Sequence, residues 1–90
     1  MKVYDKRRNK KHVCQLCFKH GETEIHHIYE GAYRRRSDRN DFVIELCHKC
    51  HMEIHQDSSK GLALKRKTEE EFEQQYSHDE FVRRMGRSWL

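Results

Sequence analysis

The chain has 90 residues, of which 34% are hydrophobic and 38% are charged, so we expect one small domain with a thin apolar core. No apolar run resembles a signal peptide or a membrane span, which predicts a cytoplasmic protein without a membrane partner. The net charge is +4, and the first 60 residues account for it, with 13 Lys and Arg against 9 Asp and Glu. Such a field suits a polyanion, most simply nucleic acid, although a solvated basic surface explains it equally well.

The first two-thirds of the chain predict a basic arm followed by two short strands. The segment "MKVYDKRRNKKH" (1–12) holds six basic residues and no apolar periodicity, which is typical of a flexible arm. The next unit, residues 13–58, contains every candidate ligand. Within it, "TEIHHIY" (23–29) and "DFVIELC" (41–47) are rich in β-favouring residues. The segment between them, "EGAYRRRSDRN", is polar and too long for a tight turn, so we expect a loop.

The chain after the second strand is predicted to be helical. The segment "HKCHMEIHQD" has helical spacing, with Gly61 as the expected stop. Residues 62–76 predict a polar helix with sparse apolar anchors, and 77–86 begin with a capping box and end on glycine. Together, 62–86 form a C-terminal helical extension. The expected fold class is α+β, with all of 1–90 in one domain.

The four cysteines form two CxxC knuckles, "CQLC" and "CHKC", which contain Cys14, Cys17, Cys47 and Cys50. A small polar domain in a reducing compartment needs a metal more than a disulfide to hold it together. The two-residue gap lets both thiolates of a knuckle reach one zinc ion at about 2.3 Å. The sequence therefore predicts a closed, structural four-cysteine Zn²⁺ site, and the alternatives are two disulfides or a redox CxxC.

Four histidines have spacings that suit a second metal. His51 and His55 leave one helix face a turn apart, whereas adjacent His26 and His27 point to opposite faces of a strand. One of the adjacent pair is expected to complete a three-ligand site, and its neighbour to stand beside the ion. Three ligands leave open positions, as in catalytic sites, and the unliganded histidine can accept a proton from water. The plainer alternative is histidines that serve only as surface or core residues.

The segments "CQLC", "IHHI" and "LCHKCHMEIH" resemble the HNH endonuclease family, over roughly residues 13–57. The resemblance implies a ββα-metal core held by the paired CxxC zinc site, with the C-terminal helices added to it. It implies that His26, His51 and His55 bind a catalytic divalent ion and that His27 is the general base. The chain looks most like small HNH proteins of phages and prophages, which places it in a bacterial host's cytoplasm.

The chain departs from the family at its middle asparagine. That residue usually lies near position 42, where this sequence has Phe42. In the family it braces the loop between the strands and so orients the base. Asn40 or Asp41 could take its place, because such a role acts through the backbone. The departure bears on catalytic efficiency more than on metal binding.

A run of arginines lies between the expected base and the expected helix. It comprises Arg34, Arg35, Arg36 and Arg39. Guanidinium groups there can clamp phosphates bidentately, and the alternative is a solvated charge run. No base-reading motif is visible, so we expect low sequence specificity.

These patterns together predict a metal-dependent endonuclease that nicks or cleaves DNA by hydrolysing phosphodiester bonds. Mg²⁺ or Mn²⁺ is the expected working ion, and Zn²⁺ or Ni²⁺ also suits histidine-rich ligation. One alternative is a weak or inactive HNH-fold module that binds nucleic acid or a protein partner. Another is a purely structural zinc domain whose histidines are incidental.

Overall fold

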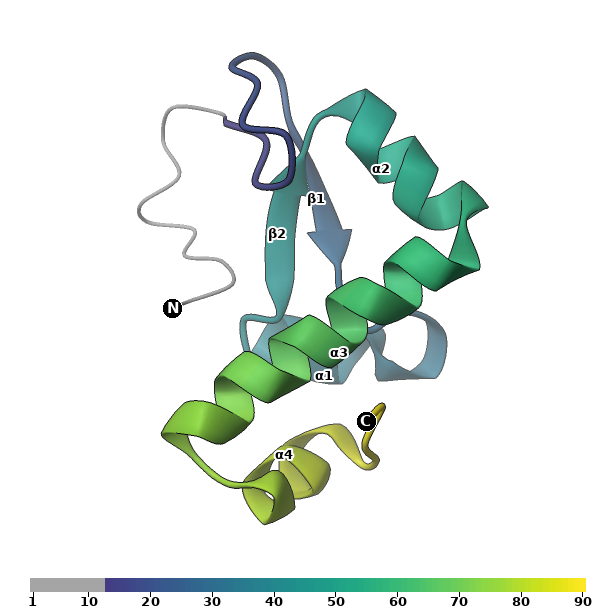
Figure 1. Ribbon diagram of the computed structural model, residues 1–90. Helices are drawn as coiled ribbons and strands as arrows, with labels where there is room; N and C mark the ends of the chain where they lie inside the picture. Colours follow the sequence, from purple (N-terminus) through teal and green to yellow (C-terminus); the bar gives the residue numbers. More distant parts are fainter. Residues whose placement is uncertain (1–12) are drawn as a thin grey trace.

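The computed structural model describes residues 13–90, so the basic arm predicted for residues 1–12 lies outside the described part of the chain. The elements in order are β1 (Glu24–His27), the short 3₁₀ turn η1 (Gly31–Tyr33), α1 (Arg34–Arg39), β2 (Val43–Leu46), α2 (His48–Gln56), α3 (Ser58–Gln75) and α4 (His78–Met85). The expected α+β class is confirmed (Figure 1).

The two strands form an antiparallel pair at the centre of the fold. Their register pairs Glu24 with Leu46 and His27 with Val43. All four residues of β2 are buried, whereas β1 is exposed at both Glu24 and Ile25. The two predicted strands are confirmed, although each is shorter than its β-favouring run. The sheet therefore offers β1 as its more accessible strand, and β1 carries the histidine pair.

The prediction of a loop between the strands was wrong, because this segment folds into η1 and α1. Ser37, which is fully buried, explains the difference. Its hydroxyl donates to the carbonyl of Phe42 at 2.6 Å and accepts from the backbone N–H of Tyr29 at 3.2 Å. This one side chain joins the end of β1 to the start of β2. A six-residue helix held by such a contact has no apolar periodicity to reveal it.

Gly61 does not stop the helix that follows β2, and that prediction was also wrong. The break falls four residues earlier, at Asp57, whose carboxylate accepts from the backbone N–H of Ser59 at 3.0 Å. Asp57 thus caps the N-terminus of α3, a role that suits its short acidic side chain. Gly61 lies inside α3, buried against the carbonyl of Ile54, where α3 and α2 pack together.

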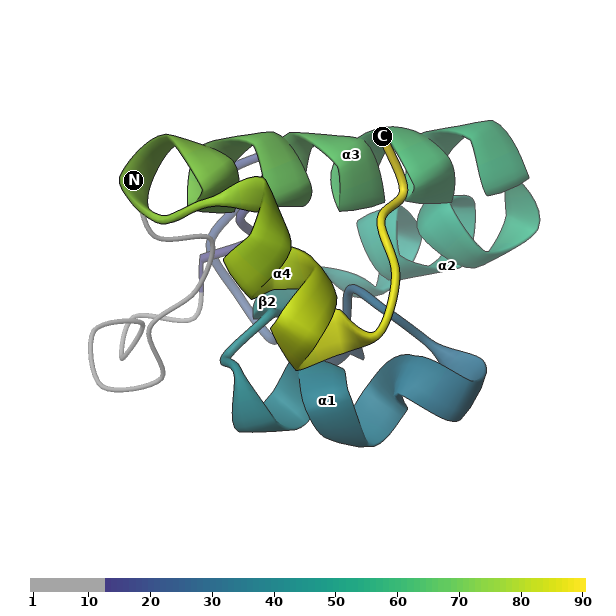
Figure 2. The ribbon, with the colours of Figure 1, turned by 90° about the horizontal axis from the view of Figure 1, so that it is seen from below.

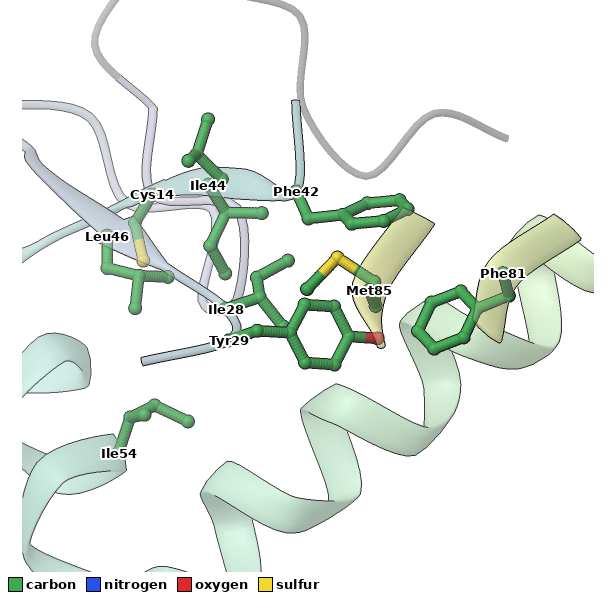
Figure 3. Packing of buried hydrophobic residues seen from close by; sticks show 10 residues of the cluster. Cys14, Ile28, Tyr29, Phe42, Ile44, Leu46, Ile54, Phe81 and Met85 are labelled. Carbon is green, nitrogen blue, oxygen red and sulfur yellow. The ribbon is translucent and has the colours of Figure 1, made fainter. Parts of the chain in front are cut away.

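The C-terminal helices cover the core with aromatic side chains. The ring of Phe42 lies 5.6 Å from that of Tyr29 and 5.6 Å from that of Phe72 on α3. Figure 3 shows Tyr29, Phe42, Phe81 and Met85 gathered between the sheet and α4. Phe42 is therefore a core residue that attaches the helices to the sheet.

The end of the chain returns to α3. Figure 2 shows the segment after α4 turning back toward that helix. The buried carboxylate of Glu69 accepts from the hydroxyl of Ser88 at 2.6 Å and from the backbone N–H of Trp89 at 2.7 Å. The Trp89 ring lies 4.4 Å from that of Tyr29.

No helix formed by residues 13–90 is both long and apolar enough to cross a membrane.

The predicted N-cap at Ser77 and the glycine end of α4 are confirmed, but the Glu80 carboxylate of the expected capping box accepts from Arg83 and Arg84. The hydroxyl of Ser77 accepts from the backbone N–H of Glu80 at 3.0 Å. Gly86 ends the helix at a φ of 88°, which favours glycine. A Cβ at Gly86 would collide with the guanidinium of Arg36, which donates to the carbonyl of Met85 at 2.9 Å. Arg36 thereby fastens α1 to the end of α4.

Candidate metal centres

Four cysteine thiols lie together where the N-terminal knuckle meets the start of α2. Cys14 and Cys17 flank a tight turn, Cys47 is the N-cap of α2, and Cys50 lies in its first turn. Their sulfur atoms all lie within 4.8 Å of one another, and those of Cys17 and Cys47 are 3.8 Å apart. Sulfurs bound tetrahedrally at 2.3 Å to one zinc ion are separated by about 3.8 Å. The cluster therefore fits Zn²⁺.

The thiols are free, so the alternative of two disulfides is not what this fold contains. Burial alone would raise the pKa of the Cys14 thiol, but backbone N–H groups of Cys17 and Cys47 lower it to about 6. Burial, together with the neighbouring thiols, raises the pKa of Cys50. The knuckle amides thus favour a thiolate at Cys14, the form that binds a metal.

Three histidines form a second cluster beside the first. The structure brings together His26 from β1 with His51 and His55 from α2, and one ring nitrogen of each lies within 4.8 Å of the others. The His26 ring lies 5.2 and 5.3 Å from the two helical rings, and the Nε2 atoms of His51 and His55 are 3.0 Å apart. These are the three ligands that the sequence predicts.

His26 is suited to bind a cation without first losing a proton. Its side chain is only 2% exposed, and this burial lowers its pKa to about 4, despite the opposing charge of Glu30. The imidazole is therefore neutral near pH 7, with a nitrogen lone pair available. Its burial also fixes the ring at the inner side of the cluster.

Two glutamates accompany the helical histidines. An oxygen of Glu24 lies 2.7 Å from Nδ1 of His51, and the other lies 3.0 Å from Nδ1 of His48. An oxygen of Glu30 lies 3.4 Å from Nδ1 of His55. Hydrogen bonds from His51 and His48 lower the pKa of Glu24, so its carboxylate is ionised. The period of two along a strand puts Glu24 on the same face as His26, a signal that sequence reasoning overlooked.

His27 points away from this cluster and faces α1. Its Nε2 lies 3.5 Å from a carboxylate oxygen of Asp38. Asn40, one of the two candidates to brace the segment between the strands, donates its amide to the carbonyl of Arg36 in that segment at 2.8 Å. Asp41 is exposed, with a left-handed φ of 58°. Asp38 is therefore an acidic neighbour of His27. No signal in the sequence indicated this contact, because it depends on α1, which was expected to be a loop.

The four arginines of the expected phosphate clamp divide into two groups. Arg34, Arg35 and Arg39 are exposed on α1. Arg36 is also exposed in part, but its guanidinium is bonded to the end of α4. Three guanidinium groups on one short helix thus remain turned to solvent.

Comparisons with protein-family models, with curated proteins and with solved structures found no match. What the protein does must therefore be inferred from its own residues and their geometry.

Proposed function

We propose that this protein is a metal-dependent HNH-type endonuclease that hydrolyses DNA phosphodiester bonds. The observation that carries the proposal is the convergence of His26, His51 and His55 from a strand and a helix whose start also holds the four-cysteine cluster. The order strand, strand, helix agrees with the ββα-metal core that the motifs resemble. Two metal centres on one frame fit a structural zinc and a catalytic ion.

The geometry of the histidines supports binding of a single ion. Nitrogens bound at about 2.1 Å to one ion lie about 3.0 Å apart at a right angle. The Nε2 atoms of His51 and His55 have this separation. His26, His51 and His55 would hold a divalent ion there, and the ion would supply neutralisation of phosphate charge and of the leaving 3′-oxygen. Mg²⁺ or Mn²⁺ is the working ion we expect, whereas imidazole ligands bind Zn²⁺ or Ni²⁺ more tightly.

The proposed base is His27, which accepts the proton of the attacking water. Asp38, 3.5 Å from Nε2, favours a proton on that nitrogen and leaves the lone pair on Nδ1. The half-buried position of His27 keeps its ring accessible to water. A positioned base of this kind contributes roughly 10²- to 10⁴-fold to the rate.

The exposed face of α1 is the surface proposed to contact the DNA backbone. Arg34, Arg35 and Arg39 lie there, in the segment that follows the base. Guanidinium groups contact phosphates bidentately but read no sequence in doing so. We therefore propose low sequence specificity.

A second candidate function is an HNH-fold module that binds nucleic acid or a protein partner without useful catalysis. The observation that favours it is Phe42, a buried core residue where the family has the asparagine that serves the base. The two candidates share the metal clusters and differ in turnover.

Nicking of supercoiled plasmid separates these candidates. The parent, His27→Ala and the control His20→Ala, which removes an exposed imidazole on the knuckle, are each compared in Mg²⁺, Mn²⁺, Ni²⁺, Zn²⁺ and EDTA. All must be folded and carry both metals. We expect metal-dependent nicking that falls roughly 10²- to 10⁴-fold in His27→Ala alone.

Failure has two distinct forms. A parent that holds both metals yet cuts neither plasmid nor single-stranded or branched DNA supports the binding module. A parent that holds one zinc, unaffected by loss of the three histidines, supports a purely structural zinc domain.

A further inference from the structure

Two carboxylates stand at the two ends of β1, and each contacts a different histidine of α2. Glu24 begins the strand and contacts His51, while Glu30 follows the strand and contacts His55. His26 lies between the two glutamates in the chain, and its ring lies 5.2 Å from that of His51 and 5.3 Å from that of His55. The segment Glu24–Glu30 therefore contacts α2 through both glutamates and through His26, the expected ligand from the strand.

Both carboxylates approach the same type of ring atom. Each lies beside Nδ1, whereas the Nε2 atoms of the two histidines face each other at 3.0 Å. A neutral imidazole has a single N–H, and an ionised carboxylate can only accept a hydrogen bond. The hydrogen bond to Glu24 therefore selects the form of His51 with its proton on Nδ1. The negative charge of Glu30, 3.4 Å from Nδ1 of His55, favours the same form of that ring. The lone pairs on both Nε2 atoms are then directed at the same point.

This arrangement is unfavourable unless a positive charge lies at that point. Two lone pairs 3.0 Å apart repel when no proton lies between them. A cation bound by both nitrogens removes that repulsion, and carboxylates behind the rings make the nitrogens better donors. The same distance could be bridged by a proton if one ring were charged. A pair of nitrogens without a proton between them should take up a metal ion, whereas a pair that shares a proton should not.

Glu24 makes a second contact that reaches the cysteine cluster. Its other oxygen lies 3.0 Å from Nδ1 of His48, the residue that follows the N-cap cysteine of α2. His48 is 74% exposed, so the contact does not arise from burial. One carboxylate thus holds the first residue of α2 and the first helical ligand. Glu24 contacts α2 both at its first residue, beside Cys47, and at His51.

We propose that Glu24 and Glu30 are positioning residues of the histidine site: they hold the Nδ1 protons of His51 and His55, so that both Nε2 atoms bind one divalent cation. This inference rests on the proposed function, because it takes the three histidines as the metal site. Neither glutamate contacts the ion or the substrate. Each acts through the histidine that it orients.

The test measures metal binding apart from catalysis. Zinc-loaded parent, Glu24→Ala, Glu30→Ala and Glu24→Gln are titrated with Ni²⁺ by calorimetry, because nickel favours imidazole. Glu22→Ala is the matched control, since Glu22 is exposed and lies two residues before Glu24. We expect each alanine variant to bind Ni²⁺ about 10- to 100-fold more weakly than the parent. The control should bind as the parent does.

The proton positions provide a second readout that a merely structural role would not change. Nitrogen NMR of the histidine rings, without the second ion, should show His51 and His55 protonated on Nδ1 in the parent. Glu24→Ala should lose this preference at His51 alone, and Glu30→Ala at His55 alone. Glu24→Gln retains an oxygen acceptor, so it should restore the Nδ1 proton and recover part of the affinity.

The outcomes separate this inference from the nuclease proposal. Unchanged Ni²⁺ affinity in the alanine variants overturns the inference, even if the parent nicks DNA. A proton shared between the Nε2 atoms, with no uptake of Ni²⁺, also overturns it. Weakened binding with the expected loss of the Nδ1 protons supports the inference, even if no variant cuts DNA. Zinc content and thermal unfolding identify any variant that has lost its fold. If Glu24→Ala is such a variant, the Ni²⁺ affinity and the Nδ1 proton of Glu24→Gln decide between these outcomes.

Discussion

The two metal-type clusters share one helix but differ in how each is completed. α2 and its N-cap supply two cysteines to one cluster and two histidines to the other, at Cys47, Cys50, His51 and His55. The cysteine cluster takes its other two ligands from the N-terminal knuckle, which makes four. The histidine cluster takes one more from β1, which makes three. Four soft ligands close a coordination shell, whereas three leave it open to water and substrate.

The two clusters differ in the number of ligand-type side chains, four against three, although both include residues of α2. Cys50 and His51 are consecutive residues, yet they belong to different clusters because neighbouring side chains on a helix point about 100° apart. The same helix therefore contributes side chains to both clusters. Glu24 strengthens this link by holding both His48 and His51.

The largest expected effect is the loss of the cysteine cluster. Zinc bound by four thiolates supplies about 10–16 kcal/mol in small domains, against a usual net stability of about 5–15 kcal/mol. We expect Cys47→Ser, or removal of zinc by a strong chelator, to unfold most of the chain. Circular dichroism and zinc content measure this. A variant that stays folded without zinc would show that the fold does not depend on a metal at the cysteine cluster.

Loss of a histidine ligand should have a smaller and different effect. His51→Ala is expected to keep zinc and fold, because the other cluster holds the helix. In the parent, Ni²⁺ at 100 times its dissociation constant should add about 2.7 kcal/mol to the free energy of unfolding, and in the variant almost nothing. Chemical denaturation with and without Ni²⁺ measures the difference. Equal stabilisation of both proteins would place the ion elsewhere.

The next prediction concerns the residue beside the proposed base. Asp38→Asn keeps the shape of the side chain but removes the charge next to His27. We expect nicking to fall by up to about 10²-fold, the lower end of what a general base contributes, with both metals retained. Asp41→Asn is the matched control, because Asp41 is exposed and asparagine tolerates its left-handed backbone. A greater loss of nicking in Asp41→Asn than in Asp38→Asn would favour Asp41, one of the two candidates expected from the sequence.

Local patterns were enough to predict the parts of the site that depend on fixed spacings. The CxxC knuckles and the i, i+4 pair His51 and His55 are set by short-range geometry, so their clustering follows once α2 forms. The strand alternation of His26 and His27 likewise places them on opposite faces. The cap at Ser77 and the glycine end at Gly86 were predictable for the same reason.

Contacts between segments distant in the chain were not predictable in this way. α1 is held by the hydroxyl of Ser37, which bonds to Tyr29 after β1 and to Phe42 before β2. Without that helix, Asp38 could not be placed beside His27. Gly61 was expected to end a helix, but it lies inside α3, where a residue without a side chain allows close packing against α2. The helix boundary is Asp57, whose carboxylate caps α3.

A third group of ligand-type side chains tests whether proximity alone makes a metal site. Glu69, Glu73 and His78 offer atoms within 4.8 Å of one another. Here the oxygens of Glu69 are already bonded to Ser88 and Trp89, and His78 Nδ1 lies 2.9 Å from Glu73. We therefore expect Ni²⁺ binding to be unchanged in His78→Gln, in contrast to His51→Ala. Loss of an ion in His78→Gln would contradict this.

The same group should respond to pH, with the smallest effect predicted for this protein. The hydrogen bond to Glu73, aided by the charges of Glu73, Glu69 and Asp79, raises the pKa of His78. The folded state therefore holds this proton more tightly than the unfolded state. The resulting stability is fully present below the ordinary histidine pKa of about 6.5 and is lost as pH rises through the raised value. The parent should exceed His78→Gln in melting temperature most at acidic pH, and this excess should shrink toward alkaline pH. Because His78 is exposed, the difference is small, and an excess that grows with pH would reverse the assigned sign.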